Sequence, residues 1–208
     1  MVKIIAKTTL ILFITFLGSN LFSQDLDEIV LEVSQSIELD ETQTQALEKQ
    51  MGNYAISLKT IFDKYEEEEP DPQAMLTEIK HARESYHKAL KSDIGKEKFK
   101  AYEKFVEQVQ LEILGEAAGL RLLDLQDPIE MSDQQLEEMK PVMARAMKDI
   151  MATLMQYIDK PLNVRNKLKI ATSLKSAKKK MDKETAQILS AEQIKKWESI
   201  KEAAKESK

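Results

Sequence analysis

His81, Glu84 and His87 are the residues of this sequence whose types come closest to a metal site. All three fall in one predicted helix, where steps of three residues spread them over about 120° of its circumference. Zinc ligands on a helix are more often four residues apart, which brings both to one face. We therefore expect no metal and no other cofactor, and these residues are candidate ligands only in a metal-responsive alternative.

Five methionines follow one another at steps of four residues. They are Met139, Met143, Met147, Met151 and Met155. At about 100° per residue, such a stripe winds slowly around a helix. Flexible thioethers commonly fill cores, and they also suit surfaces that accept varied partners or bind copper(I). The sequence leaves these three uses open.

Residues 160–183 form a strongly basic segment in a chain of net charge −5. Asp182 is its only acid, and its bases are Lys160, Arg165, Lys167, Lys169, Lys175, Lys178, Lys179, Lys180 and Lys183. Its apolar residues predict one side of a basic amphipathic helix, and they are Val164, Leu168, Ala171, Leu174, Ala177 and Met181. A solvated face, capture of unfolded chains and attraction to an anionic membrane surface are the alternatives.

The sequence carries no signature of catalysis. It has no glycine-rich phosphate loop, no serine elbow and no paired histidine–carboxylate metal motif. It also has no cysteine, which excludes disulfides, thiolate nucleophiles and a lipid-modified cysteine. The acids of 66–71 are nearly consecutive, unlike the alternating ligands of a calcium loop. We expect a protein that is not an enzyme and, given its modest acidity, has no nucleic acid partner.

The first 23 residues have the pattern of a secretory signal peptide. Lys3 and Lys7 precede a mostly apolar run over 8–17, and Ser23 offers a small residue at the cut. The run is shorter than the ~20 residues of a membrane-spanning helix. We predict export to the periplasm and no stable membrane insertion after cleavage, with retention as an anchor as the alternative.

Behind this segment, two stretches of the chain repeat each other. Residues 37–43 match 129–135, and at the same offset Leu47, Met51, Leu58, Phe62 and Tyr65 fall on Met139, Met143, Ile150, Leu154 and Tyr157. Further on, residues 94–99 match 189–194. In this alignment Lys59, Asp63 and Glu66 correspond to Met151, Met155 and Ile158, so the second copy has a broader apolar arc.

Apolar periodicity predicts about three helices in each copy. In the first copy they cover 41–66, 73–92 and a stretch from 96 onward, separated by the prolines of 70–72 and by Gly95. We predict an all-α fold of two tandem helical-hairpin-type units, elongated or cradle-like. The predicted boundaries are 1–23 for the signal peptide, 24–127 for the first unit and 128–208 for the second.

Four sites share the pattern of an apolar residue, a cap, two further residues and glutamine. Three are Leu39-Asp40-x-x-Gln43, Met131-Ser132-x-x-Gln135 and Leu189-Ser190-x-x-Gln193, and the fourth is the degenerate Ile94-Gly95-x-x-Lys98. An N-cap side chain accepts from a free backbone N–H, and glutamine three residues later accepts from the cap's own N–H. As chemistry, we interpret these motifs as helix caps only.

The Leu-Ser-Ala-Glu-Gln of 189–193, in a cysteine-free helical chain with an export signal, resembles the LTxxQ-motif family. Its best-known members are the Spy-like periplasmic chaperones and related envelope stress proteins. The resemblance implies ATP-independent binding of unfolded proteins on a basic and apolar helical face. It also implies a homodimer, which two copies in one chain would imitate as a pseudo-dimer. Asp40, Gly95 and Ser132 depart from the family's threonine, and Lys98 departs from its glutamine.

We therefore expect an exported, chaperone-like protein that binds unfolded or partly folded envelope proteins. The expected client-binding residues are Met143, Met147, Met151, Met155, Ile158, Lys175, Lys178, Lys179 and Lys180. The alternative is a periplasmic sensor or adaptor module, metal-responsive in one version, that regulates an envelope stress signalling partner.

Overall fold

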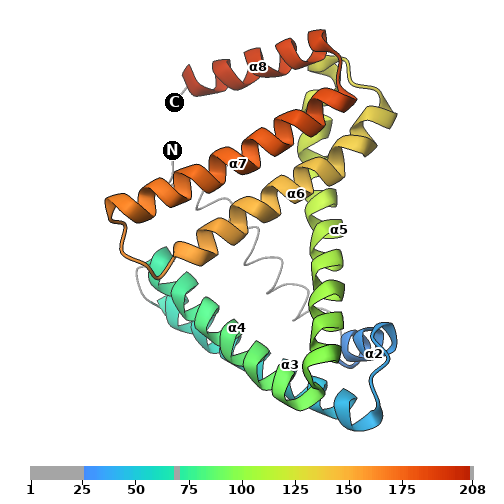
Figure 1. The fold of residues 1–208 in the computed structure, drawn as a ribbon, viewed down its shortest axis with the longest axis vertical. Coiled ribbons are helices and arrows are strands. Elements are labelled where there is room, and N and C mark those ends of the chain that lie inside the picture. The colour runs from blue at the N-terminus through green and yellow to red at the C-terminus, as the bar shows by residue number, and fades with distance from the viewer. Residues whose placement is uncertain (1–25, 68–70, 207–208) are drawn as a thin grey trace. The chain divides into compact units, whose positions relative to one another are not determined.

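The computed structural model describes residues 26–67 and 71–206, and all regular structure within these two ranges is helical. The helices are α2 (Leu26–Ser36), α3 (Glu41–Glu67), α4 (Pro72–Ile94), α5 (Lys96–Ile129), α6 (Asp133–Tyr157), α7 (Val164–Ile188) and α8 (Ala191–Glu206) (Figure 1). The all-α prediction is confirmed. The predicted signal peptide, 1–23, lies outside the described residues.

The chain divides into two compact units, residues 1–107 and 108–208. Their boundary lies inside α5, whereas the sequence placed it after residue 127. The described residues of each unit form four helical segments, where about three were expected. The first has α2, α3, α4 and the start of α5, and the second has the rest of α5, α6, α7 and α8. The sequence analysis did not predict α2. It placed the second part of α5 in the first unit, as the continuation of the helix from 96 onward, whereas this part belongs to the second unit.

The ends of α2 and α5 have the same backbone geometry. Glu38 and Glu130 both have a left-handed backbone, with φ of 55° and 56°. The next residue donates its N–H back into the helix, Leu39 to the Ser34 carbonyl at 2.9 Å and Met131 to the Gln126 carbonyl at 2.8 Å. A left-handed residue that closes such a bond is a common helix ending. The two helix endings are therefore related by the same offset as residues 37 and 129 of the sequence repeat.

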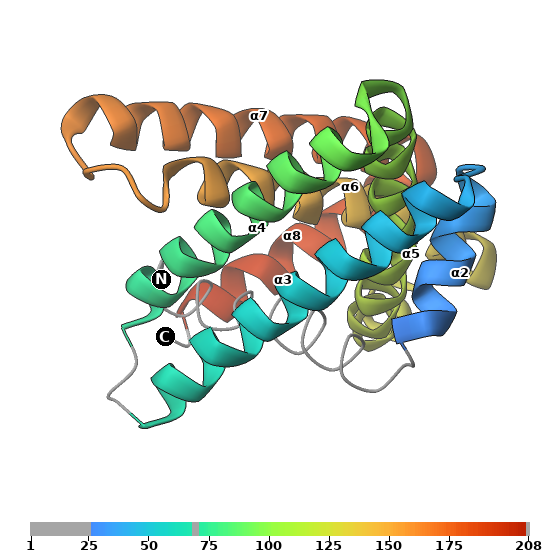
Figure 2. The ribbon, with the colours of Figure 1, turned by 90° about the horizontal axis from the view of Figure 1, so that it is seen from below.

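In each unit the middle two helices pack along each other as a hairpin. We call α3 and α4 the first hairpin, and α6 and α7 the second hairpin (Figure 2). The end of each hairpin that carries the glutamine motifs is its motif end, and the end with the connecting loop is its loop end.

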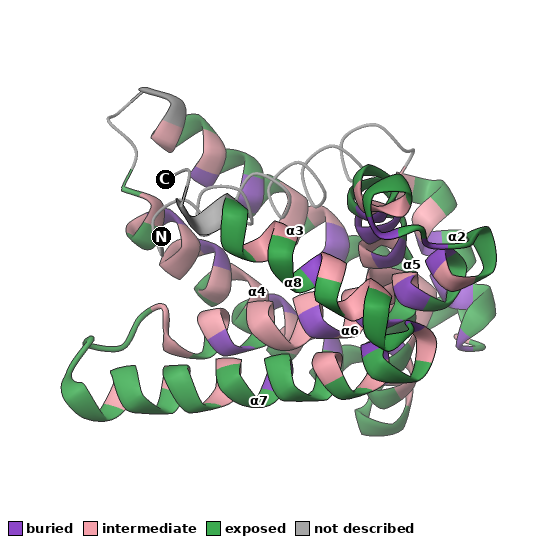
Figure 3. Ribbon diagram, turned by 90° about the horizontal axis from the view of Figure 1, so that it is seen from above, coloured by how far each residue is buried: buried purple, intermediate pink, exposed green. Residues whose placement is uncertain are grey.

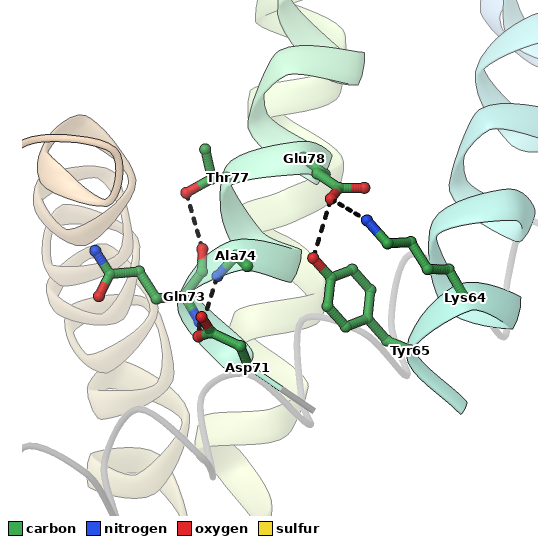
Figure 4. Close-up of polar contacts among 7 residues, drawn as sticks. All are labelled: Lys64, Tyr65, Asp71, Gln73, Ala74, Thr77 and Glu78. Atoms are coloured by element: carbon green, nitrogen blue, oxygen red, sulfur yellow. Dashed lines mark hydrogen bonds and ion pairs between the residues drawn. The ribbon is translucent and has the colours of Figure 1, made fainter. Parts of the chain in front are cut away.

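The first unit has two apolar clusters. The cluster at the motif end is buried by α2, the hairpin and the start of α5, and it contains Val30, Val33, Ile37, Leu47, Met51, Tyr86, Leu90, Ile94, Phe99 and Tyr102. The second cluster lies toward the loop end and contains Leu58, Ile61, Met75 and Ile79. Beside it, Glu78 accepts from Lys64 Nζ at 2.7 Å and from the Tyr65 hydroxyl at 3.0 Å, while Asp71 caps α4 (Figure 4). The first hairpin is therefore packed both at its motif end and toward its loop end.

Candidate binding surface

The glutamine motifs cap helices, as their spacing predicts. Asp40 and Gln43 exchange bonds of 2.8 and 3.2 Å between side chain and backbone. Ser132 with Gln135, and Ser190 with Gln193, form the same two bonds. The apolar residue before each cap packs into the core, since Met131 and Leu189 are buried and Leu39 packs against the motif-end cluster.

The glutamine side chains also bond to helices that are distant in sequence. The interpretation of the motifs as helix caps only did not predict this second role. Gln135 donates its amide to the Ile188 carbonyl at 2.9 Å, and Gln193 donates to the Glu130 carbonyl at 2.7 Å. The two amides also bond each other at 3.0 Å in both directions. Each glutamine therefore caps its own helix and binds the carbonyl end of another. We call this paired arrangement a clasp.

The first unit has an equivalent clasp with one changed partner. Gln43 donates to the Ile94 carbonyl at 3.1 Å. In place of the second glutamine, Lys98 donates to the carbonyls of Ile37 and Glu38 at 2.9 and 2.6 Å. Lys98 therefore binds the end of α2, which corresponds to the end of α5 that Gln193 binds in the second unit. The signal available in the sequence was that the motifs come in pairs, one pair in each unit.

The methionine stripe divides between core and surface. Met139 is completely buried in the cluster of the second unit, and Met143 packs against that cluster. Met147, Met151 and Met155 are only partly buried. Ile158, at the end of α6, is partly buried as well. The stripe therefore begins as core and becomes an accessible apolar edge toward the loop end.

The two hairpins differ most toward their loop ends. In the first, Leu58 and Ile79 are 1% and 2% exposed. With the offsets of the sequence repeat, their counterparts are Ile150 and Leu174, and both are partly exposed. The described part of the second hairpin forms no counterpart of the loop-end cluster. At these two positions the second hairpin leaves partly exposed the apolar side chains whose counterparts the first one buries.

Two ion pairs fix the register of the second hairpin. Arg145 contacts Glu184 at 2.5 Å, and Asp149 contacts Lys180 at 3.7 Å. The partners are four residues apart on both helices, so α6 and α7 run antiparallel in one register. Continuing that register places Met151 level with Lys178, and Met155 level with Leu174 and Lys175. The methionine edge therefore runs beside the basic part of α7.

All nine basic residues of 160–183 are exposed, and Figure 3 shows α7 exposed over most of its length. Lys178 pairs with Asp182 on the same helix, and Lys180 pairs with Asp149. Lys175 and Lys179 have no ion pair with any described residue. Two of the four predicted client-binding lysines are therefore engaged in ion pairs, and two present their charge to solvent alone.

The apolar residues of α7, which the sequence placed on one side of the helix, divide between a packed face and an exposed face. Ala177 is buried, and Leu174 and Met181 are partly buried. By contrast Val164 and Leu168 are 83% and 67% exposed. At about 100° per residue, the two groups are centred about 120° apart, so one neighbouring helix cannot cover both.

The candidate metal ligands do not converge. The His87 ring packs edge-on against Phe99 and Tyr102, with centroid distances of 5.5 and 6.4 Å, while His81 is exposed. Burial, together with the charge of Arg83, lowers the pKa of His87 to about 4. Within residues 26–67 and 71–206, no three His, Cys, Asp or Glu side chains are grouped to hold a metal ion.

Comparison of the chain with family models, with curated proteins and with solved structures finds no match. Among the helices that the structure describes, none is both long enough and apolar enough to cross a membrane.

Proposed function

We propose that this chain is an exported, non-catalytic protein that binds unfolded or partly folded proteins without nucleotide. The proposed client surface is the loop-end part of the second hairpin, with Met147, Met151, Met155 and Ile158 on α6 and the lysines of 175–180 on α7. One observation carries this proposal. The second hairpin has partly exposed methionines, Met151 and Met155, where the first has Lys59 and Asp63. It also leaves Ile150 and Leu174 partly exposed, where the first hairpin buries Leu58 and Ile79.

The physical chemistry of this surface suits weak binding of varied chains. Exposed lysines attract acidic segments over distances of about 10 Å at 0.1 M salt. Flexible thioethers then pack against apolar side chains of many shapes. Because every methionine of the edge is already partly buried, each contact gains only part of the ~1.5–3 kcal/mol of a fully buried side chain. Clients would therefore bind reversibly.

Three further features support the proposal. The clasps hold the motif ends of both hairpins, so the loop end of the second hairpin can accept a client while the core stays closed. The resemblance to the LTxxQ-motif family implies the same function and the same exported location. Lys175 and Lys179, which have no ion pair with any described residue, also present their charge to solvent within this surface.

The test is suppression of aggregation by the chain from residue 24 onward. Reduction of α-lactalbumin with dithiothreitol supplies an aggregating client, and the reductant leaves this cysteine-free chain unchanged. The variant Met151→Lys/Met155→Asp restores the residues of the first copy, Lys59 and Asp63, without changing the net charge. We expect about tenfold weaker protection, equivalent to ~1.4 kcal/mol of lost apolar contact.

A matched control separates the methionine edge from the helix that carries it. Ala152 and Gln156 are exposed on α6. The control Ala152→Lys/Gln156→Asp introduces the same two charges on the same helix and should protect as wild type does. If the methionine variant also protects as well as wild type, the methionine edge is not the client surface.

A further inference from the structure

A second apolar surface lies on the outer face of α7 and in the loop before it. Leu162, Val164 and Leu168 are 57%, 83% and 67% exposed, and Ala171 is exposed as well. Val164, Leu168 and Ala171 fall within an arc of about 60°, at steps of four and three residues. This outer face, defined by these four residues, is separate from the inner face that packs in the second hairpin.

The charge around the outer face has one sign. Between Lys160 and Met181 the sequence contains no acidic residue. Arg165 and Lys167 lie on either side of the stripe of Val164 and Leu168, and Lys175 follows on the same face; all three are exposed. The surface therefore combines shallow aliphatic side chains with a border of uncompensated positive charge.

This combination is complementary to an anionic bilayer. A helix with a narrow apolar stripe and basic borders lies flat in the headgroup region, with its apolar residues inserted by ~5–10 Å. Lysine and arginine stems extend along the apolar stripe and leave their charges at the phosphates. Each such residue near an anionic surface strengthens binding about fivefold. Because these aliphatic side chains form a single row, they offer little contact area to a bulky protein partner.

We infer that the outer face of α7 docks on the surface of an anionic lipid bilayer, parallel to its plane. This docking is peripheral and goes beyond the proposed client binding, whose apolar contacts come from the methionine edge on α6, the other helix of the same hairpin. A membrane-docked chain would keep its client surface beside the bilayer, where envelope proteins emerge unfolded.

The test is co-sedimentation of the chain from residue 24 onward with lipid vesicles. Vesicles of phosphatidylglycerol and phosphatidylethanolamine supply the anionic surface, and phosphatidylcholine vesicles supply the neutral one. We expect binding to the anionic vesicles that 0.5 M salt removes, and at least tenfold weaker binding to neutral vesicles. Val164→Gln/Leu168→Gln should lower the binding at least tenfold, and Arg165→Gln/Lys167→Gln about twenty-fivefold.

The control is Lys88→Gln/Lys100→Gln, which removes the same charge from exposed positions of the first unit and should stay within twofold of wild type. Equal binding of wild type and Val164→Gln/Leu168→Gln to anionic vesicles would overturn the inference. So would a wild type that binds no vesicles and loses client protection when Val164 and Leu168 are replaced, since the stripe would then bind protein. Circular dichroism of every variant verifies that the helices remain.

Discussion

The packing of the His87 ring determines its pKa and therefore its charge. Its ring contacts Tyr86, Phe99 and Tyr102, and Tyr86 donates to the Tyr102 hydroxyl at 2.9 Å. Burial in this aromatic group disfavours the charged imidazole, and Arg83 adds electrostatic repulsion, so its pKa falls to about 4. A residue that in the sequence looked like a metal ligand therefore acts as a neutral part of the core.

This packing predicts how stability depends on pH. The unfolded chain protonates His87 at its ordinary pKa near 6.5, whereas the folded chain does so only near 4. The stabilisation is complete above pH 6.5 and is lost as the pH falls toward 4, because only the unfolded state gains a proton there. Relative to His87→Phe, we expect wild type to lose roughly 2 kcal/mol of unfolding free energy between pH 7 and 4.5. Urea unfolding at both pH values measures this, and parallel losses in the two proteins would contradict it.

The clasps are what connect one helix to the next. The amide of Gln193 lies between the start of α8 and the end of α5, and it also bonds the matching amide at the start of α6. Each clasp thus satisfies backbone groups at several helix ends with two side chains. In the first unit Lys98 replaces one amide and still reaches two carbonyls, so the arrangement tolerates a change of chemistry when a long donor is kept.

Gln193→Ala tests this joining role. It keeps the Ser190 cap but removes the bond that the Gln193 side chain accepts from the Ser190 N–H, and both links to other helices. We therefore expect unfolding to require about 1–3 kcal/mol less free energy. Gln187→Ala, an exposed glutamine without a described bond, should change stability by less than ~0.5 kcal/mol. Chemical denaturation of both variants makes the comparison. Equal unfolding free energies of the two variants would show that the bonds of Gln193 in the clasp contribute no measurable stability.

Whether an interaction could be predicted from the sequence depends on how far apart its residues are along the chain. Helix starts at Ser132 and Ser190 could be predicted because cap and glutamine are three residues apart. The clasp could not, because Gln135 and Gln193 meet only after the chain has formed a hairpin. The apolar residues of α7 predicted a helix correctly, but periodicity does not say which arc a neighbouring helix covers. Val164 and Leu168 were therefore assigned to the same apolar side as Ala177, which is buried, whereas they are exposed.

The two units of the chain share a plan but differ in how far their hairpins are packed. Both begin with a helix that ends in a left-handed glutamate, both are clasped by a motif pair, and both present a hairpin. The first hairpin adds a second apolar cluster and the ion pair of Lys64 with Glu78 near its loop end. The second replaces these with methionines, lysines and exposed aliphatic side chains. The two hairpins thus allow a comparison within one chain between a packed hairpin and the one that we propose as the client surface.

Amide hydrogen exchange with and without a client tests this account most directly. The client is reduced and alkylated α-lactalbumin, which stays unfolded, and the exchange is followed by mass spectrometry of peptides from both hairpins. We predict that the client slows exchange at 147–158 and 170–181, and that it leaves the counterparts at 55–65 and 75–86 unchanged. Slower exchange confined to the first hairpin, or equal in the two hairpins, would contradict the assignment of the second hairpin as the client surface.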